Sequence, residues 1–209
     1  MDGDCAVTSF GNTALLRALG IMLACTAVGI TSGPVQAQVS PELLQGMQWR
    51  NVGPFIAGRV SSVAGVDGQP AIAYMGADDG GVWKTENAGI TWVPLTDAVH
   101  GIRGITALAV AQSQPQTIYA GTGSTFGSPY SSGIWTSNDA GAHWQSAGLR
   151  DAGPIAALLV DPHDPRLLLA ATRGARFTPG GQRGVFRSTD GGHSWQRVLD
   201  AGPDSGATG

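Results

Sequence analysis

Charged and aromatic residues gather in a few loops of this chain, and such mixtures are typical of a groove that binds a sugar or a peptide. The most concentrated group is an acidic pair, Asp78-Asp79, directly before Gly80-Gly81. Further candidates lie at an expected strand start, in expected links or in longer loops: Arg59, His100, Arg103, Tyr130, Arg176 and Phe177. The alternative interpretation is that these polar side chains are only solvated.

Other chemistries find no support in the residue pattern. The sequence has no Ser/His/Asp order at catalytic spacing, no phosphate-binding glycine loop and no cluster with zinc-ligand spacing. The histidine-containing segment 161–165, Asp-Pro-His-Asp-Pro, is typical of a turn rather than a metal site. We therefore expect neither a cofactor nor a metal ion.

An eight-residue pattern at 85–92, 137–144 and 188–195 returns about every 50 residues, a period typical of radial or solenoidal repeats. A Ser or Thr and an Asp or Asn two residues later can bond to nearby backbone N–H groups. A glycine then supplies a left-handed position, and a tryptophan closes the pattern. The residues expected to be structural are Thr85, Asn87, Gly89, Trp92, Ser137, Asp139, Gly141, Trp144, Ser188, Asp190, Gly192 and Trp195.

Each repeat also contains four short apolar runs separated by Gly, Pro and Asp, which is typical of a propeller blade. Glycine, 32 of 209 residues, interrupts every window of helical length. We predict an all-β fold of three four-stranded antiparallel blades at 59–95, 104–147 and 153–199, after a lead-in at 38–58. This strand count places the repeated turns at one end of the blades and the candidate binding residues at the other.

The N-terminal segment is expected to be a signal peptide. Residues 18–30 form an apolar run behind Arg17 that is too short to span a bilayer, and 35–37 offer small residues for cleavage. We predict removal of residues 1–37 and a secreted or periplasmic protein that begins at Gln38. A buried N-terminal helix is one alternative. Lipid anchoring at Cys25 is another, disfavoured because few apolar residues precede this cysteine.

Composition excludes some partners. The net charge is −3 and 13% of residues are charged, so nothing favours binding to nucleic acid, and no membrane span is expected. Both cysteines, Cys5 and Cys25, lie in the segment expected to be removed. The mature chain is therefore expected to have no disulfide.

The repeated pattern resembles the Asp-box, or BNR repeat, of β-propellers in sialidases, sortilins and xyloglucan-specific glycoside hydrolases. Residues 49–55, Trp-Arg-Asn-Val-Gly-Pro-Phe, and Gly58-Arg59-Val60 are similar to the opening of large secreted bacterial propeller proteins of the sortilin-N-terminal-like, "glycosyl hydrolase" group. In those families the repeated turns are structural and face away from the ligand. The resemblance therefore implies the same role for the three turns in this chain.

The resemblance also implies a role for one acid. In xyloglucan-specific hydrolases, an aspartate before Gly-Gly in the first blade is one of two catalytic carboxylates, and residues 74–83 are similar to that stretch. Asp79 would be that residue, and its partner would come from the far half of the protein. A tight Asp-Gly-Gly turn explains Asp79 without catalysis, and this is the interpretation that we favour. Ser124 departs from the group, where a glutamate commonly follows Gly-Thr-Gly.

Three blades do not close a propeller, which usually has four to eight. The chain reaches 207–209, Ala-Thr-Gly, where a fourth inner strand would begin, so we expect an N-terminal fragment whose further partners are the remaining blades. The expected function is a scaffold that binds a glycan or protein ligand without a complete catalytic site. The alternative is part of a glycoside hydrolase in which Asp79 is one of two catalytic carboxylates.

Overall fold

The computed structural model describes Ser40 and residues 58–124, 131–175, 181–200 and 202–208. The expected signal peptide, both cysteines and nearly all of the lead-in lie outside these residues. The described part consists of twelve strands joined by turns and loops, and no helix in it is long and apolar enough to cross a membrane.

The strands form three antiparallel sheets of four, each in chain order. The first contains β1 (Arg59–Gly65), β2 (Ala73–Asp78), β3 (Gly81–Thr85) and β4 (Val93–Pro94). The second contains β5 (Ile105–Val110), β6 (Ile118–Thr122), β7 (Ile134–Ser137) and β8 (Gln145–Ser146). The third contains β9 (Ile155–Val160), β10 (Leu168–Thr172), β11 (Gly184–Ser188) and β12 (Gln196–Leu199). The predicted all-β fold of three four-stranded antiparallel blades is confirmed.

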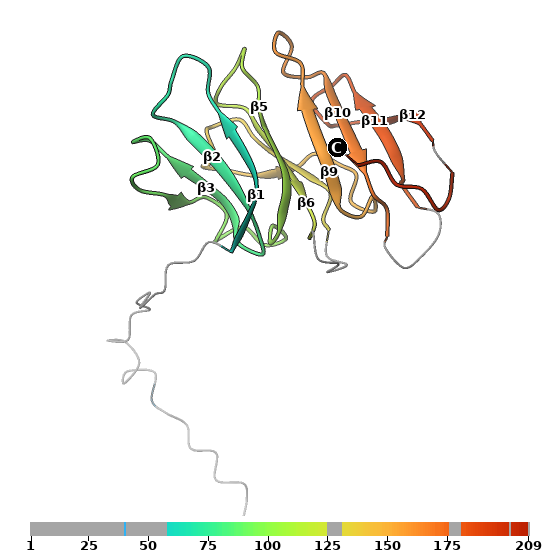
Figure 1. Cartoon of the computed structure of the whole chain (residues 1–209), viewed down its shortest axis with the longest axis horizontal. Coiled ribbons are helices and arrows are strands. Elements are labelled where there is room, and N and C mark those ends of the chain that lie inside the picture. The colour runs from blue at the N-terminus through green and yellow to red at the C-terminus, as the bar shows by residue number, and fades with distance from the viewer. Residues whose placement is uncertain (1–39, 41–57, 125–130, 176–180, 201, 209) are drawn as a thin grey trace, which may run out of the picture. The chain divides into compact units, whose positions relative to one another are not determined.

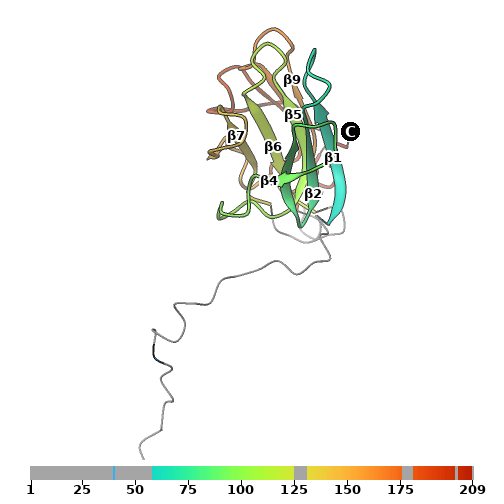
Figure 2. The ribbon, with the colours of Figure 1, turned by 90° about the vertical axis from the view of Figure 1, so that its left-hand side faces the viewer.

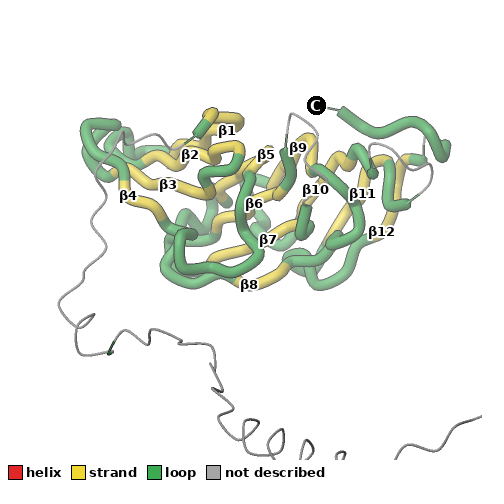
Figure 3. The backbone as a smooth tube through the Cα atoms, turned by 90° about the horizontal axis from the view of Figure 1, so that it is seen from below, coloured by secondary structure: helices red, strands yellow, loops and turns green. Residues whose placement is uncertain are grey.

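The sheets pack face to face through their inner strands. Strand β1 contacts β5, and β5 contacts β9, as Figures 1 and 3 show. Seen from the side, the second and third sheets lie behind the first (Figure 2). Buried apolar side chains fill both joints, with Tyr74, Val82 and Ile105 in the first and Tyr119, Ile134, Ile155 and Leu168 in the second.

Each inner strand carries one bulge at the same place. The register with the neighbouring strand shifts between Val60 and Ser62 and between Ile105 and Ala107, and the third sheet shifts at the matching point. The extra residues are Ser61, Thr106 and Ala156. A bulge leaves its residue out of the ladder, which frees the side chain to reach beyond its own sheet.

The two ends of the sheets differ. The repeated turns join β3 to β4, β7 to β8 and β11 to β12, and the backbone N–H of Ala88, Ala140 and Gly191 in them donates to the carbonyls of Ala71, Gln116 and Arg166 at 3.0, 2.9 and 3.0 Å. Those carbonyls belong to the turns between the first two strands of each sheet, so both kinds of turn share one end. The β2–β3, β6–β7 and β10–β11 connections lie at the opposite end, which we call the ligand end because the candidate binding residues were predicted there.

Candidate ligand-binding site

Asp78 ends β2 at the ligand end, where the first two sheets meet. It pairs in register with Arg59 of β1 and is only 5% exposed. The hydroxyl of Ser124, from the second sheet, donates to Oδ2 of Asp78 at 3.4 Å. Gly104 is also close, because a β-carbon added there would lie 3.3 Å from Oδ1. Residues that flank β5 and β6 of the second sheet therefore lie against this carboxylate.

Asp79 is the next residue, and its environment is different. It is exposed and has a φ of 64°, a left-handed conformation that aspartate tolerates better than most residues. The N–H of Gly80 closes the turn on the carbonyl of Ala77 at 3.2 Å. The N–H of Gly81 donates to the carbonyl of Arg103 at 2.8 Å, which ties the turn to the link between the first two sheets.

A pocket of about 520 Å³ opens beside this turn. Its walls include Asp79 and Trp83 from the first sheet and Asp97 and Arg103 from the link. The indole N–H of Trp83 donates to the carbonyl of Gly80 at 2.6 Å, which orients the ring against the turn. Carboxylates, a guanidinium and an indole around one hollow offer a sugar hydrogen-bond acceptors, donors and an apolar face.

The other predicted binding residues do not line this pocket or lie outside the described residues. Arg59 is exposed at the start of β1, and His100 is exposed on the link beside Gly101. Neither is among the described residues that line the pocket. Tyr130, Arg176 and Phe177 lie outside the described residues, so their positions remain predictions.

Among the charged and aromatic residues that line the pocket, Trp83 and Asp97 were not sequence candidates. Trp83 resembles an ordinary strand residue, because Trp135 and Phe186 stand at the matching place in the repeats. Asp97 lies in a link expected at the ligand end, and this was the signal that could have identified it. Ser124 was not among the predicted site residues, and its hydroxyl contacts Asp78 across the joint.

The three repeated turns share one hydrogen-bond pattern. In the second, the hydroxyl of Ser137 donates to Oδ1 of Asp139 and accepts from the N–H of Gly141, both at 2.8 Å, while Oδ1 of Asp139 accepts from the N–H of His143 at 2.8 Å. The first turn repeats these bonds with Thr85, Asn87, Gly89 and Thr91, and the third with Ser188, Asp190, Gly192 and Ser194.

These bonds lower the pKa of both aspartates. The N–H of His143, then its ring and the Ser137 hydroxyl, stabilise the charged form of Asp139 and lower its pKa to about 2. The hydroxyl and N–H of Ser194, followed by Ser188, lower the pKa of Asp190. These acids stay ionised and occupied by their own turns, so they are poorly suited to transfer protons to a ligand.

The closing tryptophans each precede their outer strand by one residue. The indole N–H of Trp195 donates to the carbonyl of Ala147 at 2.7 Å, joining the third turn to the second sheet. A β-carbon at Gly192 would lie 2.8 Å from that of Ala147, so this glycine also permits close packing.

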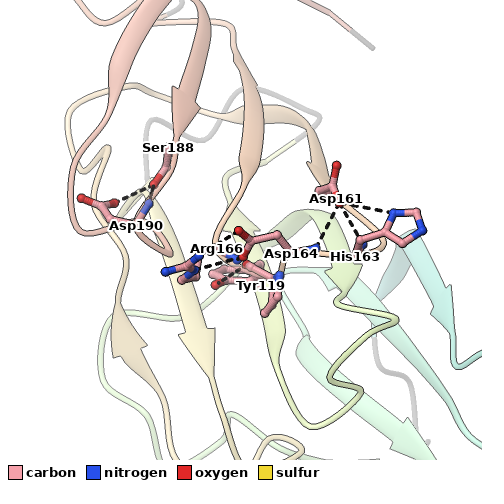
Figure 4. Close-up of polar contacts among 8 residues, drawn as sticks. Tyr119, Asp161, His163, Asp164, Arg166, Ser188 and Asp190 are labelled. Atoms are coloured by element: carbon pink, nitrogen blue, oxygen red, sulfur yellow. Dashed lines mark hydrogen bonds and ion pairs between the residues drawn. The ribbon is translucent and has the colours of Figure 1, made fainter.

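The segment around His163 is the turn between β9 and β10, at the end opposite the ligand end, and Figure 4 shows its polar contacts. Asp161 accepts the N–H groups of His163 and Asp164 at 2.8 and 3.1 Å, and Asp164 pairs with Arg166 at 3.0 Å. The hydroxyl of Tyr119 donates to the carbonyl that follows, at Pro165, at 3.1 Å. Within the described part of the chain, no group of three or more His, Cys, Asp or Glu side chains could hold a metal ion.

Comparison with known proteins finds similarity to part of several xyloglucanases. No protein-family model matches it. A xyloglucanase from Paenibacillus sp is 28% identical over 204 residues, covering 85% of this chain and 18% of that protein. The crystal structure of a GH74 xyloglucanase from Xanthomonas campestris matches with a TM-score of 0.55 and 27% identity, covering 72% of this chain and 22% of that one.

An ancestral GH74 enzyme matches with a TM-score of 0.59 at 24% identity, covering 75% of this chain and 20% of that one, and this likeness concerns the fold. The chain therefore spans about a fifth of the length of the proteins it resembles. The three sheets therefore have the fold of β-propeller blades.

Proposed function

We propose that this chain contributes a glycan-binding face to a larger xyloglucanase-like β-propeller protein. The observation that carries the proposal is the 520 Å³ pocket at the ligand end, which brings Asp79, Trp83, Asp97 and Arg103 together in a chain whose relatives are xyloglucanases. The remaining blades of the propeller are the partners that would complete the face.

Hydrolysis of a glycosidic bond needs two carboxyl groups about 5 to 10 Å apart, one on each side of the bond. Asp79 is our candidate for one of them, since its side chain is exposed at the pocket. Asp78 is an alternative candidate for the same carboxylate, because it lies where two blades meet. Its side chain is buried, however, with Ser124 and Gly104 close to its oxygens. We propose that the partner acid comes from the remaining blades.

Binding is tested by isothermal titration of the chain with xyloglucan oligosaccharides. Asp79→Asn removes one of the two carboxylates of the pocket, and loss of a charge-assisted hydrogen bond weakens binding by about tenfold. Asp161→Asn is the matched control, since it changes an aspartate in a turn at the opposite end. Equal affinity of the unmodified and Asp79→Asn chains, or an equal loss in both variants, would contradict the proposed site. Binding of a protein but no glycan would favour the scaffold alternative.

Turnover separates binding from catalysis. We expect the chain by itself to release no reducing sugar from xyloglucan, because one half-site lacks its partner carboxylate. Asp97 shares the pocket with Asp79, so it is the acid that could supply a second group within this chain. Release of sugar that is abolished separately by Asp79→Asn and Asp97→Asn would show that three blades already carry a complete site.

Two further parts of the proposal concern the repeats and the N-terminus. We propose that the three turns are Asp-boxes of the sortilin and sialidase type with a structural role, supported by their shared hydrogen bonds and their position away from the ligand end. We also propose export after cleavage behind Ala37. N-terminal sequencing of protein from the native periplasm or medium tests this, and retention of residues 15–30 would refute it.

A further inference from the structure

The third strand of each sheet begins at, or directly after, a glycine with positive φ: Gly81, Gly133 and Gly184. At the second and third of these glycines, the atom nearest to an added β-carbon is a backbone carbonyl oxygen, that of Gly148 or Leu199. At Gly81 the nearest atom is Oγ1 of Thr96. In the first sheet, therefore, a side-chain oxygen takes the place that a backbone oxygen has in the other two.

The hydrogen bonds show the same exchange. In the second sheet, the N–H of Ile134 donates to the carbonyl of Gly148 at 2.9 Å, which continues the backbone ladder beyond β8. The matching N–H in β3, that of Val82, donates instead to Oγ1 of Thr96 at 3.0 Å. Val82 is fully buried and Thr96 is 3% exposed, so this hydroxyl satisfies an N–H group in the interior.

This exchange changes the course of the link between the first two sheets. Because the hydroxyl of Thr96 occupies the ladder position, the carbonyl of Thr96 can accept from elsewhere, and it accepts the N–H of Val99 at 2.9 Å. That bond closes a turn over residues 96–99. The link therefore turns away from β3 at Thr96, whereas the backbone of Gly148 still bonds to the second sheet.

The neighbouring N–H group holds the other end of the same link. The N–H of Gly81 donates to the carbonyl of Arg103 at 2.8 Å, so Gly81 and Val82 together bind both ends of the segment 96–103. Asp97 directly follows Thr96, and Trp83 is the next residue of β3. The two bonds thus place the residues of the link beside the indole that lines the pocket with them.

We propose that Thr96 is the positioning residue of the glycan pocket: its hydroxyl redirects the link, so that Asp97 and Arg103 lie beside Trp83. Thr96 lines the pocket, but its hydroxyl is bonded to Val82, so it acts on a ligand through the residues of the link. The effect on a ligand depends on the proposed function, whereas the course of the link depends only on these hydrogen bonds.

Amide hydrogen exchange in three variants tests the course of the link. Thr96→Ser keeps the hydroxyl, and we expect protection at Val82 and Val99 within about threefold of the unmodified chain. Thr96→Val leaves the N–H of Val82 without its acceptor and should lower protection there by about tenfold or more. Thr96→Gly supplies the residue found at Gly148, so a ladder bond should keep Val82 protected while Val99 loses protection by about tenfold or more.

Isothermal titration with xyloglucan oligosaccharides tests the effect on a ligand. Thr96→Ser should bind within about threefold of the unmodified chain, and Thr96→Gly should bind about tenfold more weakly. Asp97→Asn should weaken binding in the unmodified chain but add little in Thr96→Gly, where the link has already moved. Thr117→Val is the control, since Thr117 is a buried threonine whose hydroxyl donates to Asn138 at the opposite end, and its affinity should be unchanged.

The positioning role would be overturned by equal affinity of Thr96→Gly and the unmodified chain, or by an equal loss in Thr96→Ser and Thr96→Gly. Additive effects of Thr96→Gly and Asp97→Asn, or equal exchange at Val99 in Thr96→Gly and the unmodified chain, would also overturn it. If the unmodified chain binds no glycan, the proposed function and the effect on a ligand are refuted, while the exchange pattern tests the link independently.

Discussion

The close contact of Gly121 with Ile155, between the second and third sheets, predicts how much Gly121→Ala destabilises the fold. A β-carbon there would lie 2.6 Å from Cγ2 and 2.7 Å from Cβ of Ile155, and 3.3 Å from Cβ of Ala107. These neighbours are strand residues in a packed core, and Ile155 is fully buried, so the contact cannot be relieved by a side chain moving into water. We expect Gly121→Ala to lower the free energy of unfolding by about 1 to 3 kcal/mol, the usual cost of overpacking.

A double-mutant cycle combines this change with Ile155→Ala, which removes the side chain that packs against Gly121. Alone, it should cost about 2 to 5 kcal/mol through lost burial and the cavity that remains. In the double variant the new methyl group occupies part of that cavity without a clash. The two costs should therefore fail to add, with a coupling of about 1 to 3 kcal/mol.

Urea unfolding followed by tryptophan fluorescence and circular dichroism measures the cycle, provided that the m-value stays constant. Gly65→Ala is the control, because Gly65 also lies in an inner strand but a β-carbon there meets nothing within 4 Å. This change should be neutral or stabilising by about 0.5 to 1 kcal/mol. If the unfolding free-energy changes of the two core variants add within about 0.5 kcal/mol, Ile155 does not pack directly against Gly121.

Three further predictions concern polar contacts. Asp139→Asn keeps the acceptor oxygen, as Asn87 does in the first turn, so it should fold at neutral pH, whereas Asp139→Ala should lower the urea midpoint. The fold lowers the pKa of Asp139 from 3.8 to about 2, so the ionised carboxylate stabilises the fold above pH 3.8 and this stability is lost as pH falls toward 2. In acid unfolding, Asp139→Asn should not show this loss of stability between pH 3.8 and 2. Thr106→Val removes the hydroxyl that reaches Ile155 and should cost about 1 kcal/mol in urea unfolding, while Thr106→Ser should not. Trp195→Phe loses the bond to Ala147 and should cost about 1 kcal/mol or more, and an unchanged midpoint would exclude a stabilising role for that bond.

The sequence predicted the three sheets because the evidence for them is local. Each repeated turn contains its own hydrogen-bonding residues, and short apolar runs between Gly, Pro and Asp mark the strands. The same turn recurs three times, so one irregular copy, such as Asn87 in place of aspartate, does not hide the pattern. Local chemistry of this kind can be recognised without knowing what packs against it.

The site was harder to predict because it depends on contacts between distant residues. Asp78 and Asp79 are neighbours in the sequence, but Asp78 is buried with its carboxylate bonded to Ser124 beyond β6, whereas Asp79 is exposed. Trp83 joins the pocket because its indole bonds to Gly80, whereas Trp135 at the matching place bonds to the Ser132 hydroxyl instead. Such differences between equivalent residues arise from tertiary packing, which a repeat pattern does not encode.

The backbone bonds of Ala88, Ala140 and Gly191 have a consequence for how such a protein can diversify. They join the turn between the two outer strands of each sheet to the turn between its two inner strands, which fixes the strand register at that end. At the other end the connections already differ, from the two residues between β2 and β3 to the segments 123–133 and 173–183. Doubling the length of a flexible loop costs only about 0.6 kcal/mol in closure entropy. Loops at the ligand end can therefore change in length and sequence with little loss of stability, while the hydrogen-bonded turns at the other end keep the sheets in place.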